Sequence, residues 1–230
     1  EHFNKYPTEN QAIKAVEKLK KVSWPVFKEE NSITDFINQV ESIIFEEFQI
    51  LPNLFKKLKF SDFNLKIFRA RPLGSFTNIN LFSEHRYPPI EHTTFGRCNF
   101  PKNPVFYSSN NALTALMETV RANNSNKRKF CITKWKIVQS DEELIFQHFL
   151  GDKLDPENPF KELVDKEIIQ LKEFFKDKLT EDQKNGLIYL VKFLSDSFIN
   201  DSNYSVSASL AYRAIFANHQ LPTDILMYPS

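Results

Sequence analysis

Two short stretches of the sequence carry side chains that can bind or stabilise charge. "IFRAR" (67–71) contains Arg69 and Arg71, and "GRCNFPKNPVFYSSNNALTALMETV" (96–120) contains Arg97, Tyr107 and Glu118. Planar guanidinium groups bind phosphate oxygens through paired, charge-assisted hydrogen bonds. A tyrosine ring can stack on a flat cation, and a fixed carboxylate can stabilise positive charge that develops during a reaction. The fold would have to bring these groups together for such chemistry to occur.

Each of these residues also has an ordinary structural explanation. Arg97 follows a glycine in a loop fixed by prolines, where surface arginines are common, and Tyr107 can simply belong to the core. Glu118 can be a solvated glutamate on the exposed face of a helix. The helix predicted over 110–122 has an apolar stripe that should enter the core, formed by Leu113, Leu116, Met117 and Val120. On another face of that helix, Glu118 is surrounded by small side chains, which are Thr114, Ala115 and Ala122.

The segments that must position these residues have strand-like alternation. Over 64–71, alternation puts Arg69 and Arg71 on the same face of a strand. Short strands are also predicted at 105–108, 129–138 and 223–228. Residues 72–104, between the predicted strands at 64–71 and 105–108, are rich in Pro, Asn, Ser and His. This composition predicts a long loop with one helical turn at 78–83.

Helical periodicity dominates elsewhere. Helices are predicted over 10–22 and 32–48, with 53–58 completing a helical N-terminal section, and over 158–179, 180–200 and 205–219. Too few strands alternate with helices for a doubly wound parallel sheet, so the pattern predicts an α+β fold with one mixed central sheet. The predicted parts are a helical extension at 1–60 and a domain at 61–230 that carries a helical insertion at about 139–202. The 23 phenylalanines predict a core filled largely by aromatic rings.

The chain order of the motifs resembles the RES domain family, which is named for its arginine, glutamate and serine. The resemblance is carried by "IFRAR", then by "GRCNFPKNPVFYSSNNALTALMET", "YSVSASLAYRAIF" and "DILMYPS". It covers roughly residues 64–138 and 203–230. Its most specific element runs from Gly-Arg-x-Asn through a tyrosine to a glutamate on the following helix.

The resemblance implies a fold similar to ADP-ribosyltransferases and an enzyme that consumes NAD⁺ by cleaving the bond between nicotinamide and ribose. Many members of the family are toxins paired with an antitoxin protein. The family's arginines correspond to Arg69, with Arg71 as an alternative, and to Arg97, and its tyrosine and glutamate correspond to Tyr107 and Glu118. In this interpretation the arginines bind the pyrophosphate, the tyrosine stacks on nicotinamide and the glutamate stabilises an oxocarbenium-like ribose.

The family's serine corresponds to Ser230, in a closing stretch that lacks the glycine often found after its aspartate. No base adjoins this serine in the sequence, so it is expected to bind ribose or phosphate rather than to act as a nucleophile. The helical segment at 139–202 is a second departure from the family pattern, and it can reshape the pocket or a partner surface.

Bulk composition sets limits on the partners. With a formal net charge of +1, the protein as a whole has no electrostatic attraction for nucleic acid or an anionic membrane. No membrane span or secretion signal is evident, which predicts a cytoplasmic protein. The two cysteines have no metal-ligand spacing, and His85 and His92 lack a third ligand, so no metal is expected. The oligomeric state is not predicted.

Three functions remain open from the sequence. The first is an NAD⁺-degrading enzyme that uses water or phosphate as acceptor. The second is an ADP-ribosyltransferase that modifies a protein or a nucleotide. The third is a non-catalytic interaction module in which the N-terminal helices bind a partner. No residue distinguishes the acceptor, whereas NAD⁺ binding separates the enzymes from the module.

Overall fold

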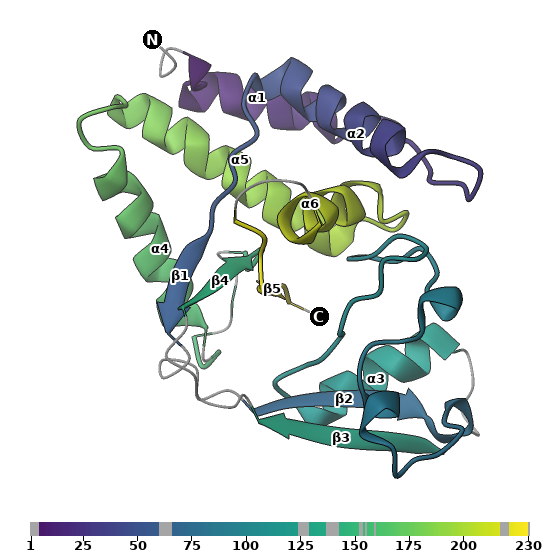
Figure 1. Cartoon of the computed structure of the whole chain (residues 1–230). Helices are drawn as coiled ribbons and strands as arrows, with labels where there is room; N and C mark the ends of the chain where they lie inside the picture. The colour runs from purple at the N-terminus through teal and green to yellow at the C-terminus, as the bar shows by residue number, and fades with distance from the viewer. Residues whose placement is uncertain are drawn as a thin grey trace. The chain divides into compact units, whose positions relative to one another are not determined.

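The computed structural model describes residues 5–59, 66–123, 129–136, 143–151, 154, 156–158, 160–216 and 221–229. Its helices and small sheets confirm the predicted α+β class. The chain forms two compact units (Figure 1). The helical unit comprises the residues up to 55, 96–98 and 147–229, and the sheet unit comprises 56–95 and 99–146. The boundary predicted after residue 60 and the insertion start predicted at 139 lie outside the described residues.

The helical unit consists of long helices and a short closing strand. Its elements are α1 (Glu9–Leu19), α2 (Ile33–Phe48), α4 (Lys161–Phe174), α5 (Glu181–Asn200), α6 (Ser205–Ile215) and β5 (Ile225–Met227). Within this unit α5 packs against α1 and α6, and α2 packs against α1 and α6 (Figure 1). The helices predicted over 10–22, 32–48, 158–179, 180–200 and 205–219 are confirmed with slightly shorter bounds.

Local sequence signals explain where α1 and α5 begin and how closely they approach. Each starts with a capping box, Thr8 with Gln11 and Thr180 with Gln183, in which side chain and backbone exchange hydrogen bonds. Gly186 faces the start of α1, and a Cβ atom there would lie 2.1 Å from the carbonyl oxygen of Pro7. Only glycine permits this approach of the two helices.

The core of the helical unit is aromatic, as the composition predicts. Phe48 and Phe198 are almost completely buried. The ring of Phe198 stacks on Phe149 at 4.5 Å between ring centres with an interplanar angle of 10°, and Phe48 lies against Phe193. Burial of such rings is a main source of the unit's stability because each removes a large apolar area from water.

The sheet unit carries the candidate site. Its elements are β1 (Lys56–Lys59), β2 (Lys66–Pro72), the 3₁₀ turns η3 (Leu73–Ser75), η4 (Phe82–His85) and η5 (Ile90–His92), α3 (Ala112–Asn123), β3 (Phe130–Lys136) and most of β4 (Glu143–His148). β2 pairs with β3 in an antiparallel ladder that runs from Lys66 opposite Lys136 to Pro72 opposite Phe130 (Figure 1). The long loop predicted over 72–104 is confirmed, and η4 overlaps the helical turn predicted at 78–83.

Three predictions about the strands need correction. Residues 56–59 form β1, which pairs with β4, and not the end of a helical section. The strand predicted at 105–108 is not formed, and only an isolated bridge joins the neighbouring Ser109 to Phe68. The described strands make two sheets, β1-β4-β5 and β2-β3, where one central sheet was predicted.

The buried side of α3 also differs from the prediction. Leu113 and Met117 are 64% and 45% exposed, whereas Ala115 is buried. The hydroxyl of Thr119 donates a hydrogen bond to the carbonyl oxygen of Ala70 in β2 at 3.2 Å. Small side chains let the helix approach the strand closely, and this contact displaces the larger apolar stripe from the packed side.

Candidate anion-binding site at Arg69

Arg69 and Arg71 project from the same face of β2, as alternation predicts. Arg69 lies opposite Thr133 and Arg71 lies opposite Cys131 in the ladder with β3. Side chains two residues apart on a strand point to the same side of the sheet. Burial lowers the pKa of Arg69, and the charge of Arg71 lowers it further.

Arg69 is a buried cation. The residue is only 8% exposed. Desolvation, with a smaller contribution from the charge of Arg71, lowers its pKa to about 10, so the guanidinium still carries its charge at neutral pH. Its Nη1 donates to the backbone carbonyl oxygen of Tyr107 at 3.0 Å. Its Nε is buried without a hydrogen-bond partner, and no carboxylate among the described residues forms an ion pair with it.

An aromatic wall lies beside this guanidinium. The Cζ atom of Arg69 is 5.0 Å from the centre of the Phe106 ring, a cation–π distance. Phe106 in turn meets Trp135 of β3 edge to face, with 5.1 Å between the ring centres. The indole Nε1 of Trp135 donates to the hydroxyl of Thr133 at 3.0 Å, which fixes the ring that supports Phe106. The wall therefore holds Arg69 without neutralising its charge.

Arg71 differs from Arg69 because its donors are already engaged. Its guanidinium donates to the carbonyl oxygen of Ser75 at 3.2 Å and to that of Glu84, and it lies 4.5 Å from the centre of the Phe76 ring. The carboxylate of Glu84 accepts hydrogen bonds from the backbone of Thr77 and Asn78. Arg71 thus anchors the loop that follows β2, and Arg69 is the better candidate to bind a ligand.

Tyr107 is joined to Arg69 through its backbone, and its ring is held by Asn99. The Tyr107 hydroxyl donates to Oδ1 of Asn99 at 2.8 Å. Asn99 is buried, and its Nδ2 donates to the carbonyl oxygen of Thr94, which fixes the orientation of the amide. Tyr107 itself is 37% exposed. Sequence reasoning gave Asn99 no role of its own, although its place two residues after Arg97 in "GRCN" was a signal.

Glu118 lies on α3 with its side chain 51% exposed, and its Oε1 is 3.5 Å from Nη1 of Arg121, one helical turn later. This arrangement matches the ordinary solvated glutamate more closely than a preformed catalytic carboxylate. Among the described residues no contact joins Glu118 to Arg69 or Tyr107. Its catalytic role therefore stays a prediction from the family resemblance.

Arg97 belongs to the helical unit and has partners there. Its Nη1 donates to the carbonyl oxygens of Phe198 and Ile199, the latter at 2.9 Å, near the C-terminal end of α5. A cation is stabilised at this end of a helix because unsatisfied carbonyls give it negative charge. The Cζ atom also lies 5.3 Å and 5.8 Å from the ring centres of Tyr204 and Tyr228. These contacts fit a structural role, and its predicted role in binding stays untested.

Ser230, the last of the predicted site residues, lies outside the described residues. Within the described part of the chain, no group of three or more His, Cys, Asp or Glu side chains could hold a metal ion. His85 places Nε2 2.7 Å from the carbonyl oxygen of Ile79 and packs on Phe76. No helix that the structure describes is both long and apolar enough to cross a membrane.

A groove of about 710 Å³ lies in the helical unit and holds none of the predicted site residues. It is lined by parts of 16–26 and 189–206, including Trp24, Tyr189 and Lys192. Its walls carry charges of both signs, so its volume alone identifies no ligand. The chemistry of the buried, uncompensated Arg69 is a stronger indication of a site than this groove.

Comparisons with known proteins found no significant match to this chain. The chain matches no protein-family model, and neither the curated proteins nor the solved structures include a significant match. The RES resemblance therefore stays a prediction that depends on the motifs in the sequence.

Proposed function

We propose that this chain is an NAD⁺-consuming enzyme that cleaves the nicotinamide–ribose bond, with water or phosphate as the acceptor. The proposal includes a toxin-like role with an antitoxin protein as a possible partner, as the RES resemblance implies. The observation that carries it is the buried guanidinium of Arg69, which has no carboxylate partner among the described residues.

Burying a charge without a counter-charge costs free energy of desolvation. An anionic ligand bound to Arg69 would supply the missing counter-charge and offset that cost. A desolvated cation with free donors suits an anion that can accept several hydrogen bonds, and a pyrophosphate does so. Perturbed titratable groups of this kind are enriched at functional sites. The nearby charge of Arg71 adds to the attraction although its donors are engaged by the loop.

The remaining roles follow from the chemistry of the bond that breaks. Loss of nicotinamide leaves positive charge on the ribose, which a carboxylate stabilises. Glu118 can serve once it leaves Arg121, because an exposed ion pair of this type is worth little. The partly exposed ring of Tyr107 is suited to stack on nicotinamide. Water as acceptor gives ADP-ribose, nicotinamide and a proton. Phosphate as acceptor gives ADP-ribose 1″-phosphate, with nicotinamide again as the leaving group.

The test is the release of nicotinamide from NAD⁺ by the purified chain, with and without phosphate. Arg69→Gln should reduce the rate at limiting NAD⁺ by about 100-fold. The matched control is Arg86→Gln, because Arg86 is an exposed arginine in the same unit that packs on Tyr87. Glu118→Gln should lower the maximal rate by about 100-fold and leave binding almost unchanged.

Absence of nicotinamide release by the folded chain, or equal rates for wild type and Arg69→Gln, would contradict the proposal. Mass spectrometry of the products then separates the acceptors. Free ADP-ribose or its 1″-phosphate supports the proposed acceptors, whereas a mass increase on a protein or a modified nucleotide identifies a transferase.

A further inference from the structure

The outer edge of β3 is an open hydrogen-bonding edge. On β2, the backbone of Phe68 exchanges hydrogen bonds of 2.7 Å and 2.8 Å with Ser109, on the side away from β3. In an antiparallel ladder, the residue opposite such a position also directs its backbone groups outward. That residue is Lys134, and Ile132 and Lys136 share its orientation.

No other described strand pairs with this side of β3, because the sheet contains only β2 and β3 (Figure 1). No backbone hydrogen bond from another described segment reaches Ile132, Lys134 or Lys136. β3 therefore presents a row of donors and acceptors that an extended chain can pair with.

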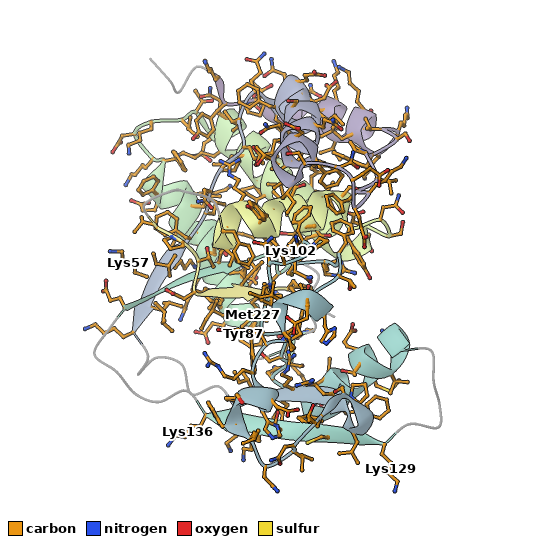
Figure 2. All side chains as sticks on the ribbon, turned by 45° about the vertical axis from the view of Figure 1, so that its right-hand side comes forward. Lys57, Tyr87, Lys102, Lys129, Lys136 and Met227 are labelled. Carbon is orange, nitrogen blue, oxygen red and sulfur yellow. The ribbon has the colours of Figure 1, made fainter. Side chains whose placement is uncertain are left out.

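The face of the sheet next to this edge is basic. Lys66 lies directly opposite Lys136, and Lys134 is two residues along on the same face. All three are exposed, and none has an ion-pair partner among the described residues. Figure 2 labels Lys136 at one end of β3 and Lys129 just beyond the other end. Like charges opposite one another weaken a sheet, so an anionic partner would relieve this repulsion.

The same lysines argue against a second copy of the chain as the occupant. Two β3 edges placed together would bring the lysines of one copy near those of the other, and edge lysines are a common protection against self-pairing. A segment with acidic side chains avoids this repulsion. Ile132 lies on the same face, two residues before Lys134, and is 43% exposed. It offers an apolar contact to a side chain of the bound segment.

We propose that β3 binds an extended acidic segment of a partner protein, which adds to the sheet as a third strand. Its backbone pairs with Ile132 and Lys134, and its acidic side chains lie beside Lys134 and Lys136, with Lys66 of β2 one strand further along the same face. This surface is separate from the Arg69 site, and the proposal does not depend on the proposed enzymatic function.

The probe is a short synthetic peptide that alternates Glu with Thr, titrated into the full chain by calorimetry. A peptide with Lys in place of Glu tests charge, and an acidic peptide with alternate amides N-methylated tests backbone pairing. Hydrogen exchange measured by NMR should show that the acidic peptide protects the amides of Ile132 and Lys134. Neither control peptide should do so.

Two variants of β3 and one control variant separate the contribution of charge from that of hydrogen bonding. The double variant Lys134→Glu with Lys136→Glu should weaken peptide binding by about tenfold or more. The double variant Lys14→Glu with Lys21→Glu makes the same change of net charge on exposed lysines of the other unit and should have no effect. Lys134→Pro removes one outward N–H and leaves the ladder with β2 in place, so it should also weaken binding.

Equal binding to wild type and to Lys134→Glu with Lys136→Glu, or no binding to the folded chain, would overturn the proposal. Tighter binding of single-stranded oligonucleotides without amide protection would also overturn it, in favour of a nucleic-acid surface. Dimerisation that protects the same amides at rising protein concentration would identify a second copy as the occupant and contradict it as well.

Discussion

Arg69 and Arg97 are the same residue type in two differently built regions. In the helical unit, Arg97 donates to the last carbonyls of α5 and lies beside two tyrosine rings. In the sheet unit, Arg69 is buried more deeply, yet it has one backbone acceptor and an unpartnered Nε. The guanidinium of Arg97 satisfies the carbonyl oxygens at the end of α5, whereas the guanidinium of Arg69 has a donor left for a ligand.

The comparison teaches that burial alone does not distinguish a structural arginine from a ligand-binding one. The distinguishing feature is whether the protein itself satisfies the charge and the donors. Substitution of Arg97 in the helical unit is therefore expected to lower stability. Substitution of Arg69 in the sheet unit is expected to weaken ligand binding and to raise stability.

The largest predicted effect on stability is at Gly186. Gly186→Ala should lower the free energy of unfolding by about 3 kcal/mol, because the added Cβ would collide with backbone atoms of Pro7 and Thr8. Urea denaturation followed by circular dichroism measures the change. Gly74→Ala is the matched control in the sheet unit, since a Cβ there meets nothing within 4 Å. A loss at Gly186 no larger than that at Gly74 would show that the approach of α1 to α5 is not tight.

A smaller loss is expected at Arg97. Arg97→Ala should cost about 1–3 kcal/mol, because the carbonyls of Phe198 and Ile199 lose their donor. Arg97→Lys should recover part of this loss, since an ammonium still favours the helix C-terminus. The same denaturation assay measures both variants. NAD⁺ titration of folded Arg97→Ala tests the binding role that the RES resemblance implies, and wild-type stability in that variant would contradict the structural role.

The smallest predicted change has the opposite sign. Arg69→Met should raise the free energy of unfolding by about 1 kcal/mol at neutral pH, because it removes a buried charge without a carboxylate partner. Below about pH 10 the arginine is charged in both the folded and the unfolded chain, so the folded state bears the full cost. As pH rises through about 10, the folded chain loses this proton first, and the cost declines.

The advantage of Arg69→Met over wild type should therefore shrink as pH rises through that range. Thermal unfolding of both proteins over a pH series measures it, and other alkaline titrations cancel in the difference. A variant that is less stable than wild type at neutral pH would show that Arg69 is a structural cation like Arg97.

Local signals in the sequence predicted much of the fold. Apolar periodicity located α1, α2 and α5, and alternation located β2 with both arginines on one face. The α3 face was predicted wrongly because its apolar stripe was stronger than the signal from Ala115 and Thr119, and only tertiary contact with β2 reveals that the small residues pack. β1 was missed because a strand of four residues has too little periodicity to outweigh its helical neighbours.

The candidate site was predictable only in part. Residue types and motif order indicated Arg69 and Tyr107, which the structure joins by a hydrogen bond. The difference between Arg69 and Arg71 depends on carbonyls of the loop, and backbone carbonyls leave no trace in sequence. The partners of Arg97 at residues 198 and 199 are likewise distant in the chain and identifiable only from coordinates.

The most direct test of the central claim is a calorimetric titration with inorganic pyrophosphate at neutral pH. Wild type and Arg86→Gln should bind it alike, and Arg69→Gln should bind about 100-fold more weakly, because Arg69 is buried with an unpartnered Nε whereas Arg86 is exposed. Circular dichroism must show that all three proteins are folded. Equal affinity of folded Arg69→Gln and wild type, or no binding to wild type, would contradict the assignment of Arg69 as an anion-binding residue.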